Sequence, residues 1–191
     1  LPKIIAEFGN EYPNISIDVS VGTYKTIEDM IIAEEVDCGF MSGTMRKELK
    51  FVPLCVDRML ALVSPKLLPS GCKTLPLEAI SDIDFIIPGE GSNYDIGRIL
   101  RTAGVRPRVK YSVSDDYAAV AMAECGLGMT IVPELILKGI GGNRAAVELE
   151  PACTRTIGIA ERSIGTGSPA CAAFMRFTEN WGKRNSEDAI Q

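Results

Sequence analysis

The sequence predicts an α/β protein made of two lobes, and three observations support this prediction. Hydrophobic residues make up 46% of the 191 residues, enough to bury a core in one large domain or in two small lobes. Aromatic residues are scarce, at 6%, as expected where helices cover parallel strands. Helix and strand patterns alternate in two series, and no linker rich in Gly, Ser or Pro separates these series.

The first series begins with a helix. The apolar spacing over residues 2–10 predicts this helix, and Tyr12-Pro13 ends it, because a residue before proline avoids the helical region. Alternating apolar residues predict a strand over 15–21, and a short helix around 27–31 and a strand over 36–41 follow. A strand normally precedes the first helix of an α/β unit, so we expect the chain to be a fragment of a longer protein.

The second series follows two apolar runs. These runs, over 51–56 and 58–63, predict long strands or one bent strand pair, and a loop with Pro69 and Pro76 comes after them. The elements expected next are a short helix over 77–80; strands over 85–87, 109–113, 129–132, 147–149 and 155–159; and helices over 94–102, 115–125, 134–138 and 168–182.

Charge and residue counts argue against several classes of protein. The net charge of −5 disfavours nucleic-acid binding by this segment, because the protein's field repels phosphates. The sequence contains no His, which removes the Ser/His/Asp and Cys/His nucleophile systems and the commonest general base. We therefore expect a binding protein, with no enzyme activity, metal or cofactor.

Cysteine spacing and hydropathy predict where the protein resides. The six cysteines form no C-x-x-C pair and lie mostly in apolar runs, which favours free, buried thiols in a reducing compartment. Oxidised, six cysteines allow 15 pairings, among which the sequence does not choose. No apolar run approaches the length of a membrane span. We expect a cytoplasmic protein with no membrane segment.

Candidate ligand-binding residues lie next to predicted strands. Gly91 and Ser92 stand in a loop between a strand and a helix, where main-chain amides and a hydroxyl can hold an anion. Capping of the helix by Ser92 or Asn93 explains the same residues equally well, and both interpretations stay open. The other candidates are Thr23 and Tyr24, which follow a predicted strand, Ser42 and Gly43, which end the next strand, and Met129 and Thr130, which begin the strand over 129–132.

Two further motifs have simpler structural explanations. Gly126-Leu127-Gly128 closes a helix, so a left-handed glycine at the helix end is favoured over a phosphate loop. Ser114-Asp115-Asp116 opens a helix, where Ser caps and the acids complement the helix dipole, and this explanation is favoured over acid catalysis.

Taken in order, the motifs resemble the effector-binding domain of LysR-type transcriptional regulators over nearly the whole chain. The opening motifs are Leu1-Pro2, Tyr12-Pro13-Asn14-Ile15, Gly22-Thr23 and Val36-Asp37-Cys38-Gly39-Phe40. The later motifs are the stretch from Arg58 to Pro65, Ile86-Ile87-Pro88-Gly89-Glu90-Gly91-Ser92, the stretch from Ala103 to Pro107, the stretch from Ala123 to Pro133, and Ser168-Pro169-Ala170. Each motif is degenerate, and their shared order and spacing carry the resemblance.

The resemblance implies a fold of the type 2 periplasmic-binding-protein kind, with two strands that cross between lobes. We expect lobe I to hold residues 1–83 and 156–191, and lobe II to hold residues 84–155. A small effector, often a carboxylate, is expected in the cleft between the lobes, against the eight candidate residues named above. The family's DNA-binding winged helix-turn-helix and the first strand of lobe I would precede Leu1.

The resemblance also implies partners and leaves alternatives. Effector domains of this family pair antiparallel, lobe I against lobe II, so we expect a homodimer or homotetramer that meets DNA only through the preceding domain. Here the segments over 2–10 and 15–21 would face the partner's helix over 115–125. The alternatives are an extracytoplasmic solute-binding protein of the same fold, which the unpaired cysteines disfavour, and an enzyme on the same scaffold, for which no convergent acid or base is found.

Overall fold

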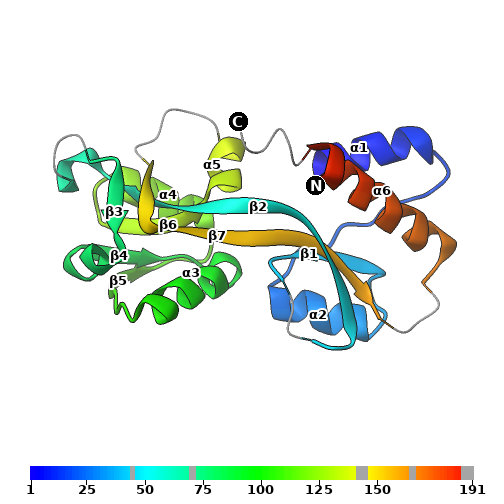
Figure 1. Cartoon of the computed structure of the whole chain (residues 1–191), viewed down its shortest axis with the longest axis horizontal. Coiled ribbons are helices and arrows are strands. Elements are labelled where there is room, and N and C mark those ends of the chain that lie inside the picture. The colour runs from blue at the N-terminus through cyan, green and yellow to red at the C-terminus, as the bar shows by residue number, and fades with distance from the viewer. Residues whose placement is uncertain (44–45, 69–71, 141–145, 164–166, 186–191) are drawn as a thin grey trace. The chain divides into compact units, whose positions relative to one another are not determined.

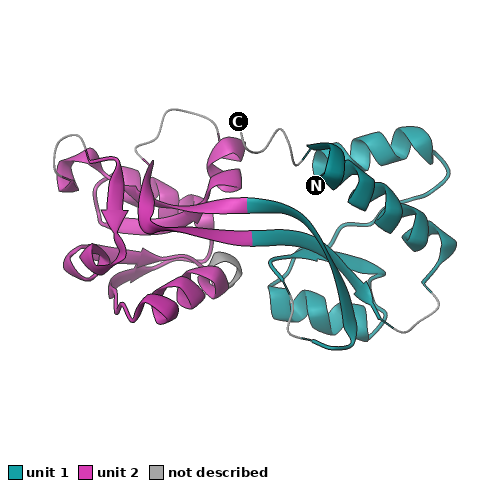
Figure 2. Ribbon diagram, viewed as in Figure 1, with its two compact units in different colours: residues 1–56, 156–191 teal, residues 57–155 magenta. Residues whose placement is uncertain are grey.

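The protein folds into two compact units in a computed structural model that describes residues 1–43, 46–68, 72–140, 146–163 and 167–185. Unit 1 holds residues 1–56 and 156–191, and unit 2 holds residues 57–155 (Figures 1 and 2). Helices and strands alternate along both, so the predicted α/β class is confirmed.

Two long strands, β2 (Leu49–Val63) and β7 (Ala146–Arg162), run from one unit into the other (Figure 2). The sequence predicts each as two shorter runs, and the structure joins them. The middle of β7 is mostly exposed or half-buried, from Glu150 to Ile157, so the apolar alternation is lost there although the strand continues. Among the described residues the strand order is β1-β7-β2-β6-β4-β5, and β3 pairs with β7.

The first unit boundary differs from the predicted one. The prediction placed residues 57–83 in lobe I, whereas the structure assigns them to unit 2. The second half of β2 pairs antiparallel with β6 (Met129–Pro133), and β3 (Thr74–Pro76) pairs parallel with β7 at residues 148–150. Leu77 and Ile80 of the 3-10 helix η2 (Leu77–Asp82) complete the attachment, because both are buried in the core of unit 2.

Unit 1 packs two helices against each other through aromatic rings. Phe8 of α1 (Pro2–Glu11) is fully buried, and its ring centroid lies 5.0 Å from that of Phe174 and 5.4 Å from that of Phe177, both on α6 (Pro169–Asn185). On β1 (Cys38–Met41), which pairs antiparallel with the end of β7, Met41 packs with Ile31 of α2 (Tyr24–Ile32).

The predicted strand over 15–21 is wrong. The backbone there forms no strand, and two of its apolar residues are largely exposed, Val19 at 56% and Val21 at 96%. A strand needs a hydrogen-bonded neighbour, and among the described residues β1 pairs with β7 and no strand pairs with this segment. The segment has the apolar alternation of a strand but lacks the hydrogen bonds to a neighbouring strand that would make it one.

Unit 2 is a sheet covered by helices on both faces. Phe85 of β4 (Asp84–Ile87) packs with Ile96 of α3 (Glu90–Ala103), while the next residue, Ile86, packs with Val120 of α4 (Asp116–Glu124). Successive residues of a strand face opposite sides, which explains why all of β6 is buried. The strand β4 runs parallel to β6 and to β5 (Arg108–Ser112). The shorter helices are η1 (Pro65–Leu67) and α5 (Glu134–Ile140).

Helix ends in unit 2 mostly follow the sequence signals. Gly126 adopts φ +80° after α4, so the expected left-handed glycine at this helix end is confirmed, and Gly104 ends α3 in the same way with φ +70°. At the start of α4 the cap is Asp115, whose Oδ1 accepts from the Ala118 N–H at 2.8 Å. The expectation that Ser114 caps this helix is wrong by one residue, because the first helical residue is Asp116.

The cysteines are only partly as predicted. All six are free, but only Cys171 is buried; Cys125 is exposed and the other four are half-buried. Cys125 is the C-cap of α4 and is exposed, whereas the apolar residues from Met129 onward are buried in β6.

Candidate functional site

Thr23 and Tyr24 start α2 in unit 1. Thr23 is the N-cap, and its Oγ1 accepts from the Thr26 N–H at 3.1 Å and lies 2.9 Å from the Thr26 hydroxyl. The Thr23 hydroxyl therefore caps the helix. The side chain is only half-buried, and its oxygen has a second lone pair that can accept another hydrogen bond. Tyr24 is half-buried and packs beside Ile31 and Met41.

Ser42 and Gly43 follow directly after β1, and the structure brings them into the neighbourhood of the first pair. Met41, the residue before Ser42, shares a core cluster with Tyr24. Gly43 has φ +72°, a conformation that favours glycine, and apart from its chain neighbours no described atom lies within 4 Å of the position where a Cβ would stand. Unit 1 therefore presents two small polar turns beside each other, both partly open to solvent.

Gly91 and Ser92 lie in the first turn of α3, and their side chains are outside the described part of the chain. The N-cap of this helix is Gly89, which has no side chain to cap with, so capping by Asn93 is wrong. Gly89 also approaches the end of the β5 segment so closely that a Cβ there would lie 2.0 Å from the Ser114 carbonyl oxygen. The close approach explains the glycine at this turn.

Met129 and Thr130 have core positions at the start of β6. Met129 is fully buried and packs with Phe85, and Thr130 is 1% exposed with its Oγ1 3.5 Å from the Ile131 carbonyl oxygen. Phe85 of β4 is opposite Met129 in parallel register, so the carboxyl end of β4, from which α3 follows, lies beside later residues of β6. Met129 and Thr130 therefore lie at the amino end of β6.

A buried ionic cluster, which the sequence did not predict, lies at that carboxyl end of β6. Arg155 donates from Nε to Asp57 Oδ2 at 3.0 Å and from Nη1 to Asp95 Oδ2 at 3.4 Å. The N–H of Leu135, two residues beyond β6, donates to Asp57 Oδ1 at 3.1 Å. Asp57 and Asp95 are 2% and 0% exposed, and Asp95 belongs to α3. The cluster therefore joins β2, β7 and α3 at the sheet edge where α/β folds bind ligands.

Burial controls the electrostatics of this cluster. Desolvation raises the pKa of the Asp57 carboxyl, and the charge of Arg155 and the hydrogen bond from Leu135 oppose that rise. Two carboxylates share one guanidinium here, with Arg98 also 3.7 Å from Asp95. Because Arg155 is already compensated, we assign it to holding the strands together and not to binding an anion.

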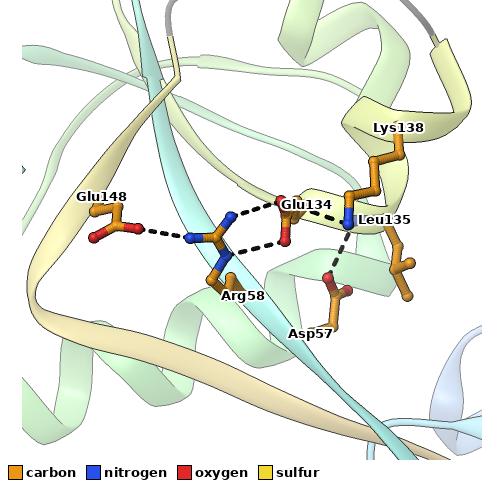
Figure 3. A network of polar contacts seen from close by, with 6 residues as sticks. All are labelled: Asp57, Arg58, Glu134, Leu135, Lys138 and Glu148. Atoms are coloured by element: carbon orange, nitrogen blue, oxygen red, sulfur yellow. Dashed lines mark hydrogen bonds and ion pairs between the residues drawn. The ribbon is translucent and has the colours of Figure 1, made fainter. Parts of the chain in front are cut away.

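A second polar network, on the surface, surrounds the neighbouring residue Arg58 (Figure 3). Its guanidinium donates to both oxygens of Glu134, at 2.7 and 3.0 Å, and to Glu148 at 2.6 Å. The hydrogen bonds and charge of Arg58 lower the pKa of the Glu134 carboxyl. No cluster of three or more potential metal ligands occurs in the described part of the chain, and no helix there is long and apolar enough to cross a membrane.

Comparisons with known proteins define the class of this chain. The two-unit α/β fold is similar to solved structures of effector-binding and regulatory domains. The fold superposes with a TM-score of 0.85 on the effector-binding domain of QuiR in complex with shikimate, at 22% identity, over 96% of this chain and 90% of that one. It matches the regulatory domain of CcmR from Synechocystis PCC6803, in complex with 2-PG, with a TM-score of 0.85 at 18% identity, over 95% and 90% of the two chains.

The family model of the LysR substrate binding domain matches residues 1–182. The chain belongs to this family, and both the predicted resemblance and the predicted two-lobed fold are confirmed. Among curated proteins it is 22% identical to the transcriptional regulator CysL of Bacillus subtilis strain 168 and 22% identical to the regulator YvbU of the same strain. These matches cover 72% and 94% of this chain but only 47% and 62% of the relatives' own length.

Proposed function

We propose that this chain is the ligand-sensing part of a bacterial transcription regulator that works in the cytoplasm. The observation that carries the proposal is the family match over residues 1–182, together with a fold shared with domains solved in complex with shikimate and 2-PG. The relatives CysL and YvbU are HTH-type transcriptional regulators, and the matched segments make up 47% and 62% of their length. Their greater length supports a DNA-binding domain that precedes this chain.

The proposed ligand is a small polar metabolite, with a carboxylate as the first class to test. It would contact Thr23, Tyr24, Ser42 and Gly43 in unit 1, and Gly91, Ser92, Met129 and Thr130 in unit 2. The turns of unit 1 support the first four residues, since all four are only half-buried and a neutral hydroxyl can hydrogen-bond a carboxylate. For Met129 and Thr130, burial favours an indirect contribution through packing.

Signal transmission would use the association of subunits. A ligand shifts an equilibrium between two arrangements only through its different affinities for them, so binding has to favour one dimer or tetramer. Exposed apolar residues support contacts at the predicted surfaces: Val19 and Val21 on the segment over 15–21, and Tyr117, 65% exposed, on α4. Such a homo-oligomer would pair unit 1 of one subunit with unit 2 of the other.

A binding screen tests this proposal. Shikimate, citrate, succinate and benzoate are added separately to the purified chain, and both the thermal midpoint and the sedimentation profile are measured. We expect at least one compound to raise the midpoint in a concentration-dependent manner, because a ligand that binds only the folded state stabilises it by mass action. We also expect the same compound to change the sedimentation profile. A broader metabolite panel with no stabilising compound would contradict the proposal.

A further inference from the structure

The side chains of Cys38 and Cys171, which are far apart in the sequence, meet in unit 1. Cys38 begins β1, and Cys171 lies in the first turn of α6. Cys38 packs against the cluster that Cys171 forms with Ile159 and Met175. The Cys171 thiol also lies 3.8 Å from the Asp37 carbonyl oxygen.

The start of α6 is held at this position by an independent contact. The Ser168 hydroxyl accepts from the Cys171 N–H at 3.0 Å, which caps the helix, and it also lies 3.3 Å from Asp37 Oδ1. Asp37 is adjacent to Cys38. Two connections therefore join the beginning of β1 to the beginning of α6: the packing of Cys38 and Cys171 in one cluster, and the contact of Ser168 with Asp37.

The two thiols differ in chemical character. The hydrogen bond from Cys38 lowers the pKa of the Cys171 thiol, against the opposing effects of burial and of the charges of Asp37 and Glu161. The positive end of α6 also favours a thiolate at Cys171. The same hydrogen bond, with burial, raises the pKa of the Cys38 thiol. Lys50, 3.2 Å from Glu161, partly compensates that carboxylate.

We propose that Cys38 and Cys171 form an oxidisable dithiol site, with hydrogen peroxide as the oxidant class. The Cys171 thiolate attacks a peroxide oxygen: an S–O bond forms, the O–O bond breaks, and hydroxide leaves. The Cys38 sulfur then attacks the Cys171 sulfenic acid, so that the S–S bond forms and the S–O bond breaks, and the Cys38 proton leaves with the hydroxide as water. Two thiols and one peroxide give one disulfide and two waters.

The disulfide would connect α6 to the strand that presents the candidate ligand residues. Ser42 and Gly43 follow β1 directly, so the site lies on the same short strand as the unit 1 turn. Because the closed loop would contain well over one hundred residues, the cross-link should restrict the unfolded chain strongly. The oxidised protein should therefore melt roughly 5–10 °C higher than the reduced protein.

Disulfide mapping tests this proposal directly. The reduced, folded protein is treated with hydrogen peroxide, free thiols are alkylated with iodoacetamide, and a digest made without reductant is analysed by mass spectrometry. We expect the peptide that joins Cys38 and Cys171 to exceed any other pair about tenfold. A dominant pair elsewhere, or oxidation of the exposed Cys125 while Cys171 stays reduced, would overturn the proposal.

Substitutions then separate the roles of the two thiols. Cys38→Ser should abolish the disulfide and leave a Cys171 sulfenic acid that dimedone captures, whereas Cys171→Ser should leave Cys38 as an unoxidised thiol. Cys125→Ser is the matched control and should leave the yield unchanged. Equal dimedone labelling in both single variants would contradict the assigned roles. Wild-type mapping stays decisive if a variant fails to fold.

Discussion

Asp57 and Arg58 are adjacent on β2, yet their side chains lie in opposite environments. Asp57 is buried against Arg155, while the Arg58 side chain is 53% exposed between two carboxylates (Figure 3). The sequence could not reveal this difference. Asp57 and Arg155 are 98 positions apart, and each stands in a segment without apolar alternation, so nothing local indicates that either is buried.

Removing the cation from the buried cluster should be far more costly than removing the exposed one. Arg155→Met leaves Asp57 buried without its cation, and we expect the free energy of unfolding to fall by about 3–5 kcal/mol. Arg58→Met is the matched control and should cost no more than about 1 kcal/mol, because its ion pairs are on the surface. Urea unfolding at pH 7 measures both values, and equal losses would contradict the cluster's role.

The ion pair of Glu134 should make stability depend on pH. The pKa of Glu134 is lowered in the folded protein, so its stabilising effect is complete above the ordinary value of 4.5 and is lost as pH falls through the folded pKa. Glu134→Gln should therefore lower the free energy of unfolding by up to about 1 kcal/mol at pH 7 and by much less at pH 3.

Urea titrations at the two pH values check this, with Arg58→Gln as the control background. In that background Glu134→Gln should lose most of its pH dependence, because the main partner is gone, although Lys138 remains 3.7 Å away. If Glu134→Gln lowers the free energy of unfolding by the same amount at pH 7 and at pH 3, the ion pair does not contribute to stability in the way described.

At the scale of elements, the sequence predicted most helices and the strands that are buried on both sides. The strand over 129–132 and the glycine that closes α4 were recognised because apolar runs and glycine stops are local signals. The segment over 15–21 failed because a strand also depends on a neighbour, which local alternation does not report. The long course of β7 was missed because its exposed middle resembles a loop.

The turn between β4 and α3 should not accept a side chain. Gly89→Ala would place a Cβ 2.0 Å from the Ser114 carbonyl oxygen, so the backbone must shift, at a cost of about 1–3 kcal/mol. Gly9→Ala is the matched control: no atom lies within 4 Å of the new Cβ, and Ala is the better helix former in α1, so stability should rise by up to about 1 kcal/mol. Thermal unfolding separates the two, and equal effects would refute the close approach.

At the scale of the whole molecule, the family and the two-unit fold were predictable, because the order and spacing of many weak motifs were available in the sequence. The first unit boundary was harder to predict from the sequence, because it depends on which strands pair with residues 59–63 and 74–76. The candidate ligand residues fall into two groups, those in partly exposed turns and those in the core. Thr23 and Ser42 lie in open turns of unit 1, whereas Met129 and Thr130 proved to have core positions.

The central claim, ligand sensing through the turns of unit 1, is tested most directly by calorimetric titration. The compound that most stabilises the protein is titrated into wild type, Thr23→Val and Ser42→Ala, with Thr102→Val and Ser81→Ala, both exposed sites in unit 2, as matched controls. Loss of a hydrogen bond to a charged ligand should weaken binding by roughly tenfold or more in the first two variants. The controls should bind within about twofold of wild type, since tenfold corresponds to 1.4 kcal/mol. Equal affinity in all five proteins would contradict the claim.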